Sequence, residues 1–167
     1  MGITEKDIET KLHSYIRDAR AMEANSLQMM QSMLLHTKDE EMRDILENHI
    51  EETKGHEQIW IDRLQGIGET SGGAKKAGAL LSAGMKGIVD QLRSDKPGKD
   101  ARDGFVTEAI EIAAYEMLSR LADRAGDTET SQLARQILAE ERAMAERLSK
   151  TWDKVIDLTL EEENVQV

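Results

Sequence analysis

Four long segments with apolar residues at helical spacing constrain the fold of this chain more than any other feature. Apolar side chains recur every three or four residues from residue 4 to about 36–38, and again over about 39–64, 101–125 and 130–160. This spacing places them on one face of an amphipathic helix. The TEKD stretch at residues 4–7 resembles a capping box at the start of the first helix. The pattern predicts an all-α protein.

The connections between these segments predict how the helices are arranged. Short turns join the first helix to the second and the third to the fourth, which favours two antiparallel hairpins. Roughly 35 residues separate the hairpins: GIGETSGG at 66–73, a glycine-containing helix at about 74–92, and SDKPGKD, which we expect to end that helix. Such a helix spans about 28 Å at ~1.5 Å per residue. The sequence therefore predicts a four-helix bundle with an extra helix in its crossover.

Composition narrows the class of protein further. The length of 167 residues suits one domain, residues 1–167, and aromatic residues make up only 3%. A net charge of −11 argues against nucleic-acid binding, because phosphate neutralisation needs basic residues. Cysteine is absent, which excludes disulfides, thiolate metal sites and a cysteine nucleophile. No segment has the length of a membrane span or the apolar region of a signal peptide. We expect a cytoplasmic protein that binds neither membrane nor nucleic acid.

Each of the four helices carries one glutamate near the middle of its apolar stripe. The four are Glu23, Glu52, Glu111 and Glu141. An ionised carboxylate removed from water costs several kcal/mol, so such a residue must be protonated, paired or bound to a cation. Any one of them, taken alone, more often reaches solvent at the edge of a stripe. Four at corresponding heights instead predict a site for two divalent metal ions, iron or alternatively manganese, which favour carboxylate and imidazole ligands.

Further side chains supplement this set. His49 lies three residues before Glu52 on the same helix face, where it is either a metal ligand or a hydrogen-bond partner of Glu52. Glu108 precedes Glu111 by three residues and is either a carboxylate ligand or an exposed helix acid. The pattern leaves open whether three more residues join the site: His56, Glu140 and Tyr115.

Several blocks of sequence resemble one protein family. The blocks YIRDARAMEANS, NHIEETKGHEQ, TEAIEIAAYEML, AGDTETS and ILAEERAMAERL resemble the YciE/YciF-type family of bacterial stress-associated ferritin-like proteins, and are most similar to the YciE branch. The resemblance covers nearly the whole chain. It implies a ferritin-like diiron carboxylate bundle that forms a compact homodimer and not a cage. It also implies metal-site roles for six residues: Glu23, Glu52, Glu111 and Glu141, with His49 and Glu108 as further candidates.

The chain departs from the wider ferritin-like pattern at two helices. That pattern supplies Glu-x-x-His twice, whereas this chain has the reversed His49-x-x-Glu52 on its second helix and Glu141-x-x-Met144 on its fourth. We therefore expect the second metal subsite to be poor in nitrogen ligands and only partly occupied.

Two functions follow from these features. The first is a metalloprotein that oxidises Fe(II), or consumes dioxygen or peroxide, in stress defence, which would make it a ferroxidase or a peroxide-reducing oxidoreductase. The second is a non-catalytic helical stress protein that acts through its dimer surface and has an empty or partly occupied metal site. Iron storage fits poorly, because a small dimer encloses no cavity for a mineral. The first two functions remain open at this stage.

Overall fold

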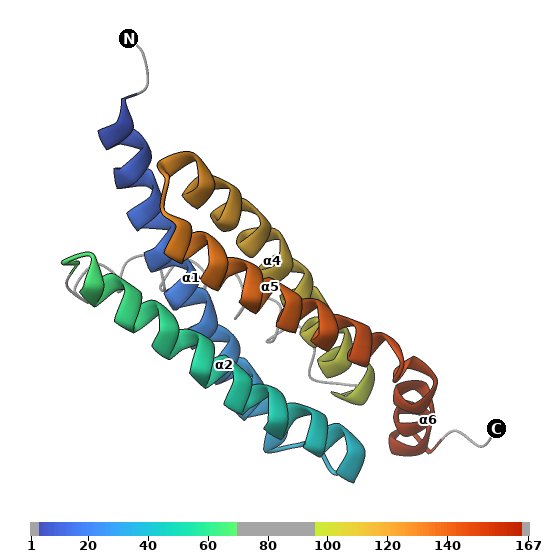
Figure 1. The fold of residues 1–167 in the computed structure, drawn as a ribbon. Coiled ribbons are helices and arrows are strands. Elements are labelled where there is room, and N and C mark those ends of the chain that lie inside the picture. The colour runs from blue at the N-terminus through green and yellow to red at the C-terminus, as the bar shows by residue number, and fades with distance from the viewer. Residues whose placement is uncertain (1–3, 70–95, 165–167) are drawn as a thin grey trace.

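The part of the chain that the structure describes is entirely helical, as predicted. A computed structural model describes residues 4–69 and 96–164, which contain five helices and no strand (Figure 1). The helices are α1 (Glu5–Leu34), α2 (Glu40–Gly66), α4 (Lys96–Ala125), α5 (Thr128–Ser149) and α6 (Trp152–Glu162). None of these helices is long and apolar enough to cross a membrane. The crossover helix expected at 74–92 lies outside the described residues.

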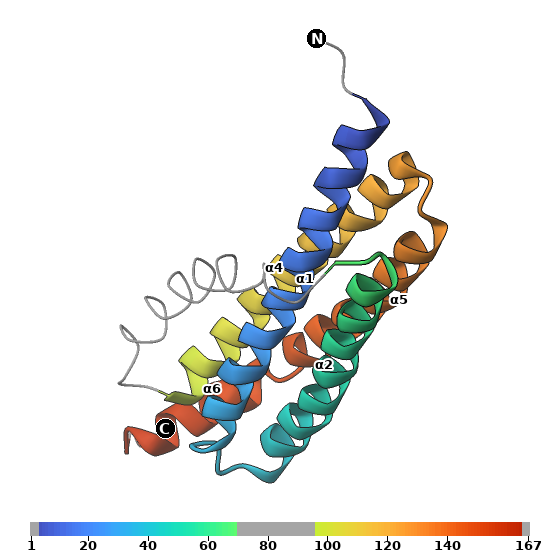
Figure 2. The same ribbon diagram turned by 90° about the vertical axis from the view of Figure 1, so that its left-hand side faces the viewer.

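The four long helices form two antiparallel hairpins. Figures 1 and 2 show α1 beside α2 and α4 beside α5, with α1 packed against α4 across the two hairpins. Helices α2 and α4 run in the same direction, so α2 ends at one end of the bundle and α4 begins at the other. This is the predicted topology with one crossover. The helices pack most extensively within each hairpin, whereas α2 and α5 touch only lightly.

Local sequence signals explain where the hairpins turn. Thr4 accepts a hydrogen bond from the Asp7 amide while the Asp7 carboxylate accepts one from the Thr4 amide, which confirms the capping box. Asp39 and Asp127 cap α2 and α5 through their side chains. Gly126, with a φ of 73°, ends α4 in a left-handed conformation that few other residues adopt cheaply.

Two predicted boundaries are wrong. Residues 96–100 were expected to end the crossover helix, but they begin α4, because Pro97 is compatible with the first turn of a helix, where no backbone N–H is needed. The single helix expected over 130–160 instead breaks into α5 and α6. The amide and hydroxyl of Thr151 both donate to the Leu148 carbonyl, at 3.0 and 2.8 Å, and tighten the last turn. Helix α6 then packs on α4, with Trp152 edge-on to Phe105.

The described helices enclose two apolar clusters with a polar layer between them. The larger cluster contains residues of all four long helices, among them Ile16, Trp60, Leu118 and Ile137. The smaller cluster, at the other end, consists of Ile45, Met144 and Leu148 with partly buried neighbours. Along every long helix, buried ionisable side chains lie between the two clusters. The bundle therefore encloses charge-bearing groups between two apolar clusters.

Candidate metal centre

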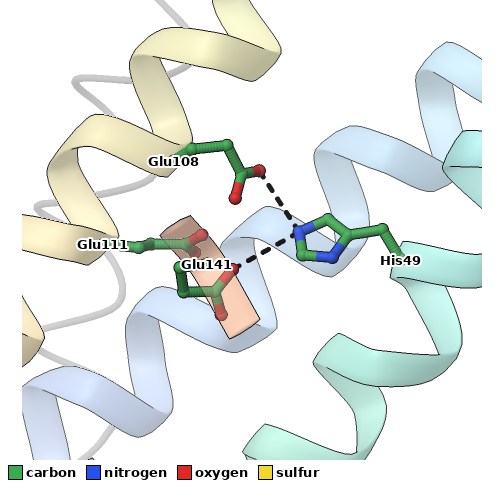
Figure 3. Close-up of side chains that lie close together, drawn as sticks. All are labelled: His49, Glu108, Glu111 and Glu141. Atoms are coloured by element: carbon green, nitrogen blue, oxygen red, sulfur yellow. Dashed lines mark ion pairs between the residues drawn. The ribbon is translucent and has the colours of Figure 1, made fainter. Parts of the chain in front are cut away.

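Six buried ionisable side chains form two overlapping groups in this polar layer. The first group consists of His49, Glu108, Glu111 and Glu141, and the second of Glu23, His56 and Glu141. Within each group, the potential ligand atoms lie within 4.8 Å of one another. All six side chains are almost completely buried, with exposed fractions between 0% and 3%. Figure 3 shows the first group, with His49 of α2 pointing toward Glu108 of α4 and Glu141 of α5.

Helical spacing explains why one helix supplies both imidazoles. His49 and His56 are seven residues apart on α2, which is close to two turns and about 10.5 Å of rise. They share an inward line with Thr53 and Trp60. Thr53 also donates a hydrogen bond to the His49 carbonyl at 2.8 Å. One helix face therefore presents an imidazole to each group.

In the first group, the His49 ring faces two carboxylates. Its Nε2 atom lies 3.2 Å from Glu108 Oε1 and 3.6 Å from Glu141 Oε2 (Figure 3). Glu111 completes the group, and the Ser26 hydroxyl donates a hydrogen bond to its Oε1 atom. The group therefore combines one nitrogen with three carboxylates.

In the second group, a chain of hydrogen bonds orients Glu23. The Trp60 indole donates to the Tyr115 hydroxyl at 2.9 Å, and Tyr115 in turn donates to Glu23 Oε1. The other oxygen, Oε2, is left to face His56 Nδ1 at 3.7 Å. Tyr115, left open by the sequence, thus holds a candidate ligand in place.

Glu141 belongs to both groups, and its two oxygens face different histidines. Oε2 lies 3.6 Å from His49 Nε2, whereas Oε1 lies 2.9 Å from His56 Nδ1. Neither oxygen is assigned a hydrogen-bond partner among the described residues, although each lies within ion-pair distance of an imidazole nitrogen. This one carboxylate is positioned to contact ions in both groups.

The buried atoms left without hydrogen bonds test whether a metal fits. Within the described residues, six such atoms belong to the two groups: Glu23 Oε2, His49 Nε2, His56 Nδ1, Glu108 Oε2, and both carboxylate oxygens of Glu141. A buried polar atom without a partner costs ~1–3 kcal/mol. Cations would take up these lone pairs, and carboxylate with imidazole is the donor set of iron, manganese and zinc sites. The site therefore fits metal ions.

A comparison with known proteins places the chain in a family. The family model described as "Domain of unknown function (DUF892)" matches residues 7–161. The chain belongs to the DUF892 family. Its fold is also that of three solved structures.

The structural neighbours span nearly the same length as this DUF892 chain. A protein from Xanthomonas campestris pv. campestris is 25% identical, with a TM-score of 0.78, and the match covers 94% of this chain and 99% of that one. YcfI from Rhodopseudomonas palustris is 21% identical, with a TM-score of 0.72 and coverage of 85% and 92%. The E. coli stress protein YciF is 18% identical, with a TM-score of 0.73 and coverage of 90% and 97%. These likenesses confirm the fold.

Burial raises the pKa of the inward carboxylates of this DUF892 chain. The pKa values of Glu23 and Glu141 lie above the usual range mainly because burial disfavours the charged form. The pKa of Glu111 is raised further, since the charges of neighbouring carboxylates add to its complete burial. Without a cation, the groups hold protons that an exposed carboxylate would release.

The same carboxylates raise the pKa of both histidines. Burial by itself would lower the pKa of His49, but the Glu108 carboxylate outweighs it and brings the pKa to about 9. For His56, burial is outweighed by Glu141 and Glu23, and the pKa rises to about 11. Both imidazoles are therefore protonated at neutral pH when no metal is bound, and a metal must displace these protons.

Each histidine also contacts a carboxylate at the edge of the bundle. Glu52 Oε2 lies 3.1 Å from His49 Nδ1, and Glu140 Oε2 lies 2.6 Å from His56 Nε2. Both carboxylates are 41% exposed. A carboxylate bonded to the far nitrogen fixes the ring and its tautomer, and makes the inner nitrogen a better ligand. Glu52 and Glu140 are thus placed to orient the imidazoles of this DUF892 site.

The structure brings together five of the six residues predicted as ligands. Glu52 is the exception, and its predicted inward position is wrong. The inward line of α2 passes through Thr53, so Glu52 lies one position to its side and reaches solvent. His56 takes a place in the second group. The expected shortage of nitrogen is therefore also wrong, because each group contains one imidazole.

We predict that Glu52→Gln and Glu140→Gln each weaken metal binding at one group only. An outer carboxylate that orients a ligand histidine typically accounts for ~10–100-fold in affinity. Titration with Mn²⁺ should show one weakened step in each variant. Glu51→Gln is the matched control, because Glu51 is exposed beside Glu52 and pairs with Lys54. Equal effects of Glu51→Gln and Glu52→Gln would contradict an orienting role.

Proposed function

We propose that this chain is a dimetal-carboxylate protein that oxidises Fe(II), or consumes dioxygen or peroxide, in stress defence. The two ions are iron, with manganese as the alternative. The observation that carries this proposal is the position of Glu141, whose oxygens face one histidine of each group. A carboxylate shared between two ions suits a pair that lies ~3.5–4 Å apart. Four buried carboxylates would also balance the charge of two divalent cations.

The residues of the chain divide the work of such a centre. The first group would hold one ion and the second group the other, with Glu141 between them. When bound, the metal pair supplies redox and Lewis-acid chemistry with positions open to an oxidant. Tyr115 and Ser26 hold the inner carboxylates Glu23 and Glu111 in place, and Glu52 and Glu140 orient the imidazoles. Apolar clusters lie on both sides of the two groups.

We include four further points in this proposal. The protein acts in stress defence, belongs to the YciE branch, is located in the cytoplasm and forms a single domain over residues 1–167. The E. coli protein with this fold is described as a stress protein, which supports the first of these. The YciE branch rests on the sequence blocks around Glu23, Glu111 and Glu141.

We also propose a homodimer. Three large apolar side chains are exposed on one face of α4: Val106, Ile110 and Met117, with exposed fractions of 42%, 46% and 54%. An apolar stripe of this kind supports an interface with a second copy.

Ile110→Asp should convert the homodimer into a monomer, because a charged side chain at an apolar interface must give up its hydration. Light scattering during gel filtration measures the mass. Leu35→Asp is the control, since Leu35 is exposed at 81% but lies outside the stripe. A wild-type monomer, or a dimer unchanged by Ile110→Asp, would contradict this interface.

One observation favours a second candidate function, that of a non-catalytic stress protein with an empty or partly occupied site. The raised pKa values of His49 and His56 let two imidazolium ions balance buried carboxylates without any metal. The protein would then act only through its surface. Occupancy and turnover distinguish the two candidates.

The decisive experiment uses untagged protein purified without chelators. Anaerobic titration with Fe(II) should reach two ions per chain, and dioxygen or peroxide should then oxidise them faster than Fe(II) in buffer. Two bound ions without accelerated oxidation would favour the second candidate. Failure to bind Fe(II), Mn²⁺ or Co²⁺ would refute the dimetal site.

A further inference from the structure

A cavity of about 340 Å³ opens into the bundle beside the first group. All five described helices contribute to its walls, and the turn between α1 and α2 forms part of its exposed rim. Five buried apolar side chains form part of its walls: Met30, Met33, Ile45, Met144 and Leu148. The cavity is therefore walled by side chains of all five described helices.

The size and lining of this cavity suit a small organic molecule. Ligand sites usually have volumes of ~300–1,000 Å³ and apolar walls with few polar groups. An apolar protein cavity of ~150 Å³ holds benzene, so the present volume has room for about two rings. Among the described residues, five methionines contribute to the lining: Met29, Met30, Met33, Met42 and Met144. Methionine side chains are flexible and polarisable, which lets such a wall adapt to different apolar shapes.

The inner end of the cavity reaches the first group. Glu108 lines the cavity, is only 3% exposed, and contacts His49 through its Oε1 atom at 3.2 Å. Its other oxygen, Oε2, is buried and has no hydrogen-bond partner among the described residues. Ser26, which also lines the cavity, donates to Glu111. A molecule in the cavity would thus lie directly beside the candidate ligands.

The charges around the cavity favour a neutral ligand. Among the described residues, the lining has one lysine, Lys38, against five acids, Asp39, Asp100, Glu108, Glu161 and Glu162. This excess of negative charge would repel an organic anion. An organic cation would lose its hydration against the methionine walls and would compete with the metal for Glu108. A neutral apolar molecule is not repelled by the acidic side chains and has no charge whose hydration would be lost.

We propose that this cavity binds a neutral, apolar organic molecule of about two rings or of similar chain length, and holds one end of it beside the first group. The binding itself needs no metal, whereas the placement of the ligand at a metal centre rests on the proposed function.

The test uses N-phenyl-1-naphthylamine, a neutral two-ring-system fluorophore that brightens in apolar surroundings. The full chain, in the presence of a chelator, should bind one probe per chain with a micromolar dissociation constant, and 1-octanol should displace it. In protein loaded with Co²⁺, the bound probe should also shift the visible absorption of the metal.

Gly104→Leu should weaken probe binding at least tenfold. Gly104 lines the cavity, and a Cβ atom there would lie 3.6 Å from Leu148 Cδ1, so a leucine fits the helix but fills part of the cavity. Gly55→Leu is the matched control, because a Cβ at Gly55 meets nothing within 4 Å. If Gly104→Leu lowers the melting temperature of the protein, Ala101→Leu on the same wall is the second variant. Co²⁺ stoichiometry should stay unchanged in all three variants.

The outcomes separate this inference from the proposed function. Absence of probe binding to the wild-type chain, equal weakening by Gly104→Leu and Gly55→Leu, or one probe per two chains would each overturn the cavity proposal. If Co²⁺ still binds in those cases, the dimetal proposal stands alone. If the probe binds but no metal does, the cavity proposal stands and the dimetal proposal falls.

Discussion

Glu141→Gln should abolish metal binding in both groups at once. A neutral amide cannot replace a carboxylate that offers one oxygen to each group, so the variant loses charge and a ligand at both positions. Glu23→Gln, by contrast, should remove only one of the two binding steps, since Glu23 belongs to the second group alone. Isothermal titration with Mn²⁺, together with metal analysis after dialysis, measures the number of ions per chain.

The control for this experiment is Glu146→Gln. Glu146 lies on α5 like Glu141, but it is exposed and pairs with Lys150. Its substitution should leave both binding steps intact. We expect the metal-free Glu141→Gln chain to fold but to be less stable than the wild type at neutral pH, because the buried imidazolium of His56 loses one of its carboxylate partners. Two ions retained by Glu141→Gln would rule out a shared carboxylate.

The metal-free protein should become less stable as the pH rises from about 5 to 9. All resolved pKa shifts in the two groups are upward, so the folded chain binds more protons than the unfolded chain above the ordinary pKa of glutamate. A group with a raised folded pKa stabilises the fold fully below its unfolded pKa, and this contribution disappears as the pH passes its folded pKa.

The size of the effect follows from the histidines. For His49, whose pKa rises from 6.5 to about 9 on folding, the contribution lost over that interval is roughly 3 kcal/mol. His56 retains its proton to a higher pH, about 11. Below pH 4 the trend reverses, because acids outside the core with lowered pKa values, such as Asp7 and Asp39, then lose their hydrogen-bonded charged forms.

Urea denaturation at pH 6 and pH 8.5, with and without Mn²⁺, measures this dependence. The metal should stabilise the fold more at pH 8.5, where fewer protons must be displaced, and each site at a hundredfold excess over its dissociation constant adds ~2.7 kcal/mol. The metal-free Glu141→Gln variant should show a shallower loss of stability with pH. Metal-free protein that is more stable at pH 8.5 than at pH 6 would contradict the raised pKa values.

The sequence predicts the helices and most of the site because both follow from helical spacing. Glu23, Glu111 and Glu141 each interrupt an apolar stripe, and all three are buried in the structure. His49 and Glu108 lie one turn from a predicted glutamate position and also point inward. Burial of carboxylates in a bundle is costly enough that their repeated occurrence at one height is informative.

Other features could not be predicted from the sequence, because the spacing of apolar residues does not fix the rotation of a helix about its axis. On α2, a shift of one position exchanges Glu52 for Thr53 on the inward line, and two overlapping apolar stripes on this helix leave that choice open. The seven-residue spacing from His49 to His56 was a signal that could have identified His56. The break at Thr151 depends on hydrogen bonds to the α5 terminus and on packing of α6 against α4, which periodicity does not encode.

The placement of both imidazoles on α2 has a mechanical consequence. Helix α2 packs well against α1 but only lightly against α5, so the two hairpins are least firmly joined along this seam. Cations bound by His49 and His56 of α2 and by Glu141 of α5 would cross-link these two helices inside the bundle. Loss of the metal would then loosen α2 before the rest of the bundle, and amide hydrogen exchange in α2 would report the state of the centre.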